Sequence, residues 1–189
     1  MIKTVYTKIV ALGDSITQGY PFGSKASWVN ILKNKHGLNI ENKGINGDTL
    51  EGMLERFDND VKFLSPKLVI VMGGTNDVFN GYSLSAMEYN LKQIVKRAEA
   101  LSIKPIIGIP IPVDDPAVEA KLKRFRFFLK EFTIQNKIPV INFYNEMVDS
   151  SGKIKAEYDF DGVHPSREGY KIMSQVADYS LKEILNRSE

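Results

Sequence analysis

Short apolar runs alternate with longer amphipathic segments along almost the whole chain. The runs are rich in β-branched residues, which is typical of strands, and they recur roughly 30 residues apart, as in βαβ units. They cover residues 8–12, 38–41, 67–72, 105–109 and 139–143. Between the runs, apolar residues recur at intervals of three and four, which predicts amphipathic helices. These predicted helices cover residues 50–61, 87–98, 118–132 and 170–184, with a further one ending near His36.

The third run, Leu68–Met72, is apolar at every position. Such a run predicts a strand buried on both faces, as in a parallel sheet. Right-handed crossovers between parallel strands place helices on both faces of the sheet. We therefore expect an α/β fold, a three-layer α/β/α sandwich. The chain length of 189 residues fits a single domain spanning residues 1–189.

Composition removes several classes of function. Lys and Arg number 25 against 23 Asp and Glu, so the net charge of +2 provides no broad positive field for nucleic acid. Cysteine is absent, which excludes disulfides, thiolate metal sites and a cysteine nucleophile. No apolar run approaches the roughly 18 residues of a membrane helix. Lys3 and Lys8 interrupt the apolar N-terminus, so we expect no signal peptide, no stable membrane insertion and a cytoplasmic location. The oligomeric state is left open.

Small and polar residues gather where the predicted strands end. Because the carboxyl ends of parallel strands meet at one edge of the sheet, the loops that follow them are expected to form the functional site. Three of these loops follow the first three strands, and a fourth precedes the last helix. They are residues 13–19, 44–48, 73–77 and 161–165.

The chain holds two histidines, and they have different settings. His36 lies near the end of a predicted helix and precedes Gly37, where a cation and a left-handed glycine cap are common. We interpret His36 as structural. His164 lies in a loop with Asp161 three residues earlier, a carboxylate that can orient the imidazole ring.

Each remaining candidate has an ordinary structural explanation. Ser15 is a common type of helix cap, Gly47 is typical of a tight turn, and Asn76 is typical of an Asx turn. The α/β-hydrolase elbow G-x-S-x-G is absent. The joint placement of these residues in loops at one sheet edge, together with Asp161 and His164, nevertheless predicts a serine site with oxyanion donors, a base and an orienting acid.

The four loops resemble the sequence blocks of the GDSL, or SGNH, family of serine esterases and lipases. They read Gly-Asp-Ser-Ile-Thr-Gln-Gly at 13–19, Asn-Lys-Gly-Ile-Asn-Gly-Asp-Thr at 42–49, Gly-Thr-Asn-Asp at 74–77 and Asp-Gly-Val-His-Pro at 161–165. All four occur in the family's order and span nearly the whole chain. Ile16 stands where the family name has leucine, a conservative apolar change.

The resemblance implies a role for each candidate. Ser15 corresponds to the nucleophile, while Asp161 and His164 correspond to the acid and the base. The backbone N–H groups of Ser15 and Gly47 and the side chain of Asn76 correspond to the oxyanion hole. The resemblance also implies a flavodoxin-like, five-stranded parallel sheet and no metal or other cofactor. The implied reaction is hydrolysis of small-molecule carboxylic esters, a class that includes lysophospholipids, thioesters, short acyl esters and acetylated sugars.

Two other functions are consistent with parts of the sequence. Four aspartates near predicted strand ends are suited to Mg²⁺ in a phosphotransferase or phosphohydrolase: Asp14, Asp48, Asp77 and Asp114. Against this hypothesis, carboxylates at such turns often cap helices, and the sequence has no Walker A motif to hold phosphate. A non-catalytic binding module is the second alternative, and it predicts that one or more of the candidate catalytic residues are replaced. None is.

The expected loops at the catalytic edge are short and leave no room for a lid domain. They carry aromatic residues that either line an acyl site or pack beneath the loops: Tyr20, Phe22, Phe79, Tyr82, Tyr144 and Phe160. We therefore predict activity on dispersed esters with short-to-medium acyl groups, without activation at an oil–water interface.

Overall fold

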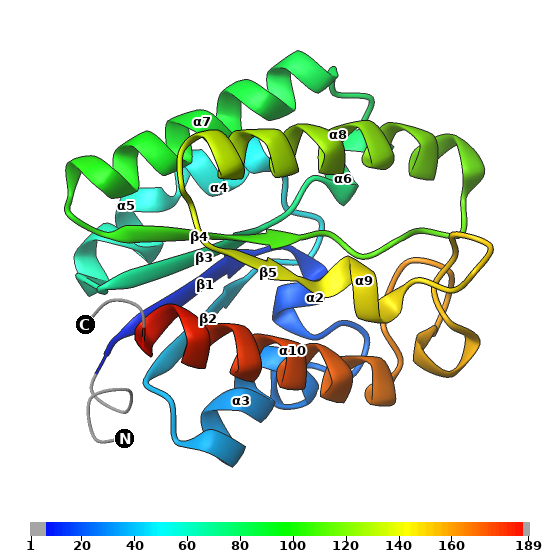
Figure 1. Ribbon diagram of the computed structural model, residues 1–189, viewed down its shortest axis with the longest axis horizontal. Helices are drawn as coiled ribbons and strands as arrows, with labels where there is room; N and C mark the ends of the chain where they lie inside the picture. The colour runs from blue at the N-terminus through cyan, green and yellow to red at the C-terminus, as the bar shows by residue number, and fades with distance from the viewer. Residues whose placement is uncertain (1–6, 187–189) are drawn as a thin grey trace.

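A computed structural model describes residues 7–186 of the chain. Most of the N-terminal segment on which the expected cytoplasmic location depends, residues 1–6, lies outside this range. The described residues form a five-stranded, all-parallel sheet in the order β2-β1-β3-β4-β5 (Figure 1). The strands are β1 (Ile9–Gly13), β2 (Ile40–Gly44), β3 (Leu68–Met72), β4 (Lys104–Ile109) and β5 (Val140–Asn142).

Helices cover both faces of the sheet. Helices α4 to α8 lie on one face, and α3 and α10 lie on the other (Figure 1). The α-helices are α2 (Ser15–Gln18), α3 (Trp28–His36), α4 (Leu50–Glu55), α5 (Phe57–Asp60), α6 (Thr75–Phe79), α7 (Leu84–Ala100), α8 (Pro116–Gln135), α9 (Phe143–Met147) and α10 (Arg167–Asn186). Short 3₁₀ turns lie at Ser24–Ala26, Lys62–Leu64 and Ala156–Tyr158.

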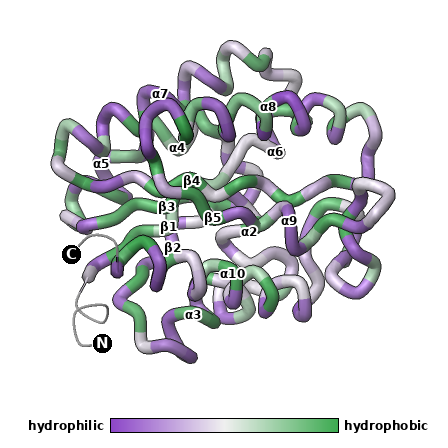
Figure 2. Tube along the Cα trace, in the orientation of Figure 1, coloured by the Kyte–Doolittle hydropathy of each residue, from purple (hydrophilic) through white to green (hydrophobic). Residues whose placement is uncertain are grey.

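The hydrophobic core is split by the sheet into two halves. Because side chains alternate along a strand, Val10 and Leu12 of β1 pack toward α4, α7 and α8, while Ile9 and Ala11 pack toward α3 and α10. Figure 2 shows hydrophobic and hydrophilic positions alternating along the helices, as expected for helices between a core and solvent. None of the helices within residues 7–186 combines the length and hydropathy needed to cross a membrane.

The predicted three-layer α/β/α fold is confirmed, and three local differences have physical causes. Strand β2 begins two residues later than the predicted run and extends through polar residues, because it lies at the edge of the sheet. The predicted helix over residues 50–61 is broken at Arg56, whose φ of −88° and ψ of 5° separate α4 from α5. Apolar periodicity continues across the break and therefore conceals it. The short helices α2, α6 and α9 hold too few residues to show a helical period.

The strand order reverses between β1 and β3. In open parallel sheets, this switch point leaves a crevice at the carboxyl ends of the strands, where ligands bind. Gly13 pairs with Met72 in the β1–β3 register, so the loops that carry Ser15 and Asn76 leave the sheet side by side. The topology therefore brings two predicted site residues to the position where this fold binds ligands.

Candidate active site

Ser15 is the first residue of α2, and Asp14 alone separates it from the end of β1. Asp14 caps this helix, with its Oδ1 accepting a hydrogen bond of 3.0 Å from the backbone N–H of Ile16. The Ser15 N–H lies in the first turn of the helix, where N–H groups lack an intrahelical acceptor. Ser15 itself is 7% exposed, so its hydroxyl is presented from a nearly buried position.

His164 connects the Ser15 hydroxyl to the Asp161 carboxylate. Its Nε2 lies 3.0 Å from Ser15 Oγ, and its Nδ1 lies 2.9 Å from Asp161 Oδ2. When Nδ1 carries the ring proton and donates a hydrogen bond to the carboxylate, Nε2 is free to accept the Ser15 hydroxyl proton. Partial burial acts to raise the pKa of Asp161, but hydrogen bonds from the backbone and ring of His164 hold this pKa below its usual value. Asp161 therefore stays a carboxylate beside the ring.

We call residues 159–165 the acid–base turn, because it carries both Asp161 and His164. Backbone hydrogen bonds close it: the Phe160 N–H donates to the His164 carbonyl at 3.0 Å, and Asp159 forms a β-bridge with Pro165. Asp161 Oδ1 also accepts a bond of 2.8 Å from the His164 N–H. The spacing of three residues between acid and base thus follows from a tight turn in which the carboxylate contacts both the backbone and the ring.

We call residues 45–49 the oxyanion loop, because it carries Gly47 between β2 and α4. Gly47 has a φ of 76°, in the left-handed region that favours glycine. Within the described part of the chain, its backbone N–H has no hydrogen-bond acceptor. The loop begins beside the Ser15 strand, because the Ile45 N–H donates to the Gly13 carbonyl at 3.1 Å.

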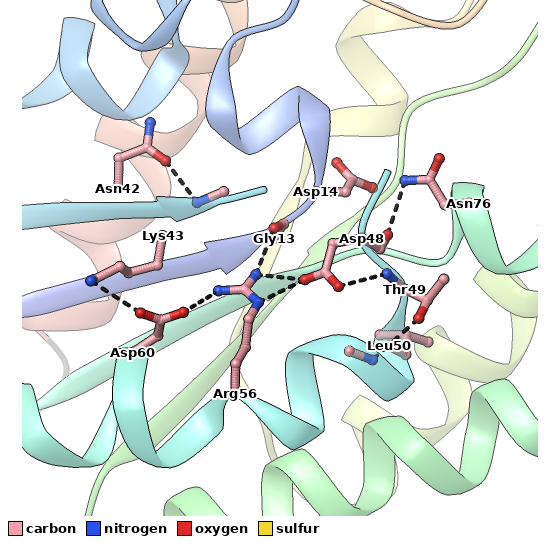
Figure 3. Close-up of polar contacts among 12 residues, drawn as sticks. Gly13, Asp14, Asn42, Lys43, Asp48, Thr49, Leu50, Arg56, Asp60 and Asn76 are labelled. Atoms are coloured by element: carbon pink, nitrogen blue, oxygen red, sulfur yellow. Dashed lines mark hydrogen bonds and ion pairs between the residues drawn. The ribbon is translucent and has the colours of Figure 1, made fainter. Parts of the chain in front are cut away.

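Asn76 lies in α6 and contacts the oxyanion loop. Its side-chain Nδ2 donates a hydrogen bond of 2.9 Å to the backbone carbonyl of Asp48 (Figure 3). An amide group carries two hydrogens, so one N–H fixes the side chain while the other is left to donate elsewhere. The neighbouring Asp77 accepts hydrogen bonds from the Leu50 N–H with both of its carboxylate oxygens, at 3.2 and 3.1 Å. The loops after β2 and β3 are therefore joined at two points.

The four aspartates of the metal hypothesis each have a protein partner. Asp14 caps α2, Asp48 pairs with Arg56, Asp77 binds the Leu50 N–H, and Asp114 pairs with Lys153. Burial raises the pKa of Asp14 to about 7 and that of Asp77 to about 6. Across residues 7–186, no three or more His, Asp or Glu side chains are grouped so that they could hold a metal ion.

Of the six aromatic residues expected at the catalytic edge, three lie in ring pairs at the acid–base turn, two contact charged side chains elsewhere, and Phe79 is exposed. The Tyr20 ring lies 4.6 Å from the His164 ring, and the Phe22 and Phe160 rings lie 5.4 Å apart, all measured between centroids. Tyr82 and Tyr144 have other partners: the Tyr82 hydroxyl donates to Glu51, and the Tyr144 ring faces the Arg126 guanidinium. Phe79 is 48% exposed.

Two further side chains contact this region although the sequence analysis did not select them. The Tyr170 hydroxyl donates a bond of 2.6 Å to the Tyr20 carbonyl and so fixes the backbone beside the His164 ring. Arg56 binds Asp48 and the Gly13 carbonyl. The sequence signal for Arg56 is its position three residues after Met53, which places a charged residue on the apolar face of the predicted helix. His36, the other histidine, lies 3.4 Å from Asp178 of α10 and is followed by the left-handed cap Gly37.

Comparisons with known proteins show the family of this chain. The sequence model of the GDSL-like lipase/acylhydrolase family matches residues 11–172. The chain is 28% identical to thioesterase 1/protease 1/lysophospholipase L1 of Escherichia coli K12, over 93% of this chain and 82% of that protein. It is 30% identical to an arylesterase of Vibrio mimicus, over 94% of this chain and 88% of that protein. A solved structure assigned to the G-D-S-L lipolytic family, from Desulfitobacterium hafniense DCB-2, has a TM-score of 0.87 at 31% identity and covers 92% of this chain and 99% of its own.

Proposed function

The chain belongs to the GDSL-like lipase/acylhydrolase family and is a carboxylic ester hydrolase, and we propose that Ser15 is its nucleophile. The observation that carries this proposal is the continuous contact from Ser15 Oγ through the His164 ring to Asp161, at 3.0 and 2.9 Å. The proposal is supported because His164, the proposed general base, lies within hydrogen-bond reach of Ser15, and Asp161 lies within hydrogen-bond reach of the other ring nitrogen.

The reaction then proceeds in two halves. His164 Nε2 takes the Ser15 hydroxyl proton as Oγ attacks the ester carbonyl carbon. The tetrahedral intermediate collapses, the ester C–O bond breaks, and the leaving alcohol receives the proton from His164. A water molecule then attacks the acyl-enzyme, gives its proton to His164 and releases the acid, while Ser15 recovers its hydrogen. Asp161 holds the ring and stabilises the imidazolium formed in each half.

Three N–H donors are available for the negative charge that develops on the carbonyl oxygen. They are the backbone N–H groups of Ser15 and Gly47 and the second Nδ2 hydrogen of Asn76. Donors fixed in place before the reaction stabilise such an oxyanion without the reorganisation that water would need. The Gly47 N–H, which has no acceptor within residues 7–186, and the anchored Asn76 amide support this role.

We propose that the substrates are dispersed esters or thioesters with short-to-medium acyl groups. Aromatic side chains beside His164 provide an apolar surface for such a group, and Tyr20 and Phe160 are 40% and 51% exposed. The names of the Escherichia coli and Vibrio relatives, which include thioesterase, lysophospholipase and arylesterase, support this range of leaving groups.

The test of the proposed function is a series of p-nitrophenyl esters and acyl thioesters of increasing chain length. Wild-type protein should turn over the shorter members. Ser15→Ala should lose this activity, and Ser180→Ala, a serine on α10 away from the site, should keep it. Folded Ser15→Ala protein with wild-type turnover would contradict the proposal, and so would a wild type that turns over no member of the series.

Two added measurements separate the alternatives. Activity should saturate below the solubility limit of the ester, whereas a sharp rise on crossing that limit would indicate an interfacial lipase. Treatment with EDTA should leave ester hydrolysis unchanged. Loss of hydrolysis in EDTA, with recovery on adding Mg²⁺, would instead favour a metal-dependent reaction.

A further inference from the structure

The oxyanion loop has few backbone bonds to hold it. Within it, the Asp48 N–H donates to the Ile45 carbonyl at 3.2 Å, and the Gly47 N–H has no acceptor among the described residues. Ile45 is 47% exposed, so packing does not fix the loop from outside. A glycine with positive φ adds conformational freedom at the position that carries the proposed donor. The position of the Gly47 N–H therefore depends on side-chain anchors at the ends of the loop.

Arg56 is the side chain that ties this loop to the strand before Ser15. Its Nε and Nη2 lie 2.8 and 2.7 Å from Asp48 Oδ2, and Nη2 also donates to the Gly13 carbonyl at 2.9 Å. Its Nη1 donates to Asp60 Oδ2 at 2.7 Å. Figure 3 shows the guanidinium between the end of β1, the oxyanion loop and α5. One group thus contacts both segments that carry the proposed backbone donors.

The geometry favours arginine over lysine at this position. Its planar guanidinium offers five N–H donors in a fixed fork, whereas a lysine ammonium is a compact charge on a flexible stem. The Arg56 side chain is 13% exposed, and its fork of donors reaches Asp48, Asp60 and the Gly13 carbonyl from the break between α4 and α5.

The charges around Arg56 are balanced. Asp48 and Asp60 flank the guanidinium, and Lys43 lies 3.1 Å from Asp60. Partial burial acts to raise the pKa of Asp60, but hydrogen bonds from Arg56 and Lys43 hold it below its usual value. Asp60 therefore stays charged at neutral pH, and the side chains of the network are Arg56 and Lys43 on one side and Asp48 and Asp60 on the other.

We infer that Arg56 is a positioning residue that sets the oxyanion hole, acting through Asp48 on both Gly47 and Asn76. Asp48 follows Gly47 directly, and its backbone carbonyl accepts the Asn76 amide while its side chain binds Arg56. Displacing Asp48 would therefore move two proposed donors together. This inference rests on the proposed function, because it assigns Arg56 a part in the same reaction.

The kinetic test compares Arg56→Met, Arg56→Lys and Arg97→Met. Arg97 is the matched control, because it binds the Leu54 carbonyl and Asp58 on the same pair of helices but does not contact the oxyanion loop. Arg56→Met should lower kcat roughly 10–100-fold, the effect of a misplacement of about 1 Å, with KM within about threefold. Arg56→Lys should recover part of this loss, and Arg97→Met should stay within about twofold of wild type.

A double variant tests the route of the effect. If Arg56 acts through the oxyanion hole, Arg56→Met should lower the kcat of Asn76→Ala protein less than it lowers that of wild type, because part of the stabilisation that it disturbs is already absent. Full multiplication of the two losses would overturn the inference. So would an Arg56→Met effect confined to KM, or equal kcat losses in Arg56→Met and Arg97→Met.

Hydrogen exchange tests the anchor independently of turnover. The N–H groups of Asp48, Thr49 and Leu50 all donate hydrogen bonds, and their exchange should accelerate in folded Arg56→Lys and Arg56→Met but not in Arg97→Met. Unchanged exchange in both Arg56 variants would overturn the inference even in an active enzyme. A wild type that hydrolyses no ester would instead contradict the proposed function, while the exchange result would still decide whether Arg56 holds the loop.

Discussion

The oxyanion loop bonds to Gly13 and the acid–base turn bonds to Ser15, but the two regions are held by different interactions. The loop depends on buried charges, with the Arg56 and Asp48 side chains 13% and 10% exposed. The turn depends on backbone hydrogen bonds, including one of 2.7 Å from the Asp114 N–H to the Gly162 carbonyl, and its Asp161 side chain is 37% exposed.

This difference predicts how each region responds to substitution. Replacing the His164 side chain should remove chemistry while leaving the backbone of the turn in place, because backbone hydrogen bonds and the Asp161 carboxylate hold it. Changes in the charged network around the oxyanion loop should move the loop as well, because removing one partner of a buried ion pair leaves the other uncompensated. Substitutions in the charged network should therefore lower the stability of the protein more than replacement of His164 does, even where both kinds of substitution lower turnover.

The largest effect on turnover is expected for His164→Ala. Loss of the general base should lower kcat roughly 10⁴–10⁶-fold, while the melting temperature changes little. His36→Ala is the matched control, since it removes the other histidine, and it should keep kcat within about twofold. The measurement is p-nitrophenyl ester hydrolysis together with thermal unfolding followed by circular dichroism. Comparable losses in the two variants would contradict the assignment of His164 as base.

Asn76→Ala should have the next largest effect. Removing one oxyanion donor typically costs roughly 10²–10³ in kcat, with a smaller change in KM, because the charge develops only in the transition state. The variant also loses the bond to the Asp48 carbonyl, so its stability should fall by about 0.5–1.5 kcal/mol. Asn80→Ala, an exposed asparagine just after α6, should change neither quantity. An effect of Asn76→Ala on KM alone would assign this residue to substrate binding.

Gly44→Ala tests the packing between the end of β2, which leads into the oxyanion loop, and α2, which carries Ser15. A Cβ atom at this position would lie 2.1 Å from the Gln18 backbone nitrogen, so the helix that carries Ser15 must shift. We expect a loss of stability of about 1–3 kcal/mol together with a fall in kcat.

Gly37→Ala serves as the control for the Gly44 substitution. Gly37 has a φ of 65° but open space around its Cβ position, so alanine should cost roughly 1–2 kcal/mol while leaving kcat intact. Unfolding curves and kcat measured on the same preparations separate the two effects. Wild-type kcat in Gly44→Ala protein would show that the contact between Gly44 and α2 does not position Ser15.

Much of the fold and the site is predictable from the sequence, because local periodicity and loop residues carry the signal. The buried run Leu68–Met72 forms the central strand β3, as expected, and Ser15 and Asn76 follow the carboxyl ends of β1 and β3, where His164 contacts Ser15. Arg56 was missed because its partners, at Gly13, Asp48 and Asp60, come together only in the folded chain.

The aspartates at strand ends were ambiguous for a similar reason. A carboxylate near a strand end is equally consistent with a metal ligand, a helix cap and an ion pair, and sequence does not reveal its partner. The structure gives Asp77 the Leu50 N–H and gives Asp48 the Arg56 guanidinium. Such partnerships depend on tertiary contacts between separate loops, which periodicity does not report.

The smallest effect on turnover is expected for Asp14→Asn, which tests the protonation of the buried carboxyl group that caps α2. Burial raises the pKa of Asp14 from 3.8 to about 7, so between these values the native state binds more protons than the unfolded state. Stability from this group is therefore full below about pH 4 and is lost as the pH rises toward 7. Asp14→Asn keeps a capping oxygen and should remove this part of the pH dependence.

Unfolding by denaturant at a series of pH values checks the Asp14 prediction. The stability of Asp14→Asn relative to wild type should increase as the pH rises across this window, with kcat near wild type. Asp77, whose pKa is also raised by burial, to about 6, remains in both proteins, and its charge acts to raise the pKa of Asp14, so the measured difference includes the loss of this repulsion. A stability difference that is independent of pH would contradict the expected protonation of Asp14.

The central claim, that Ser15 forms an acyl-enzyme, is tested most directly by mass spectrometry of protein quenched in acid during turnover of p-nitrophenyl acetate. The account predicts a mass increase of one acetyl group, mapped to the peptide that contains Ser15. It predicts no such adduct in Ser15→Ala protein. An acetyl group on another residue that is essential for turnover, or rapid hydrolysis by folded Ser15→Ala protein, would contradict the account.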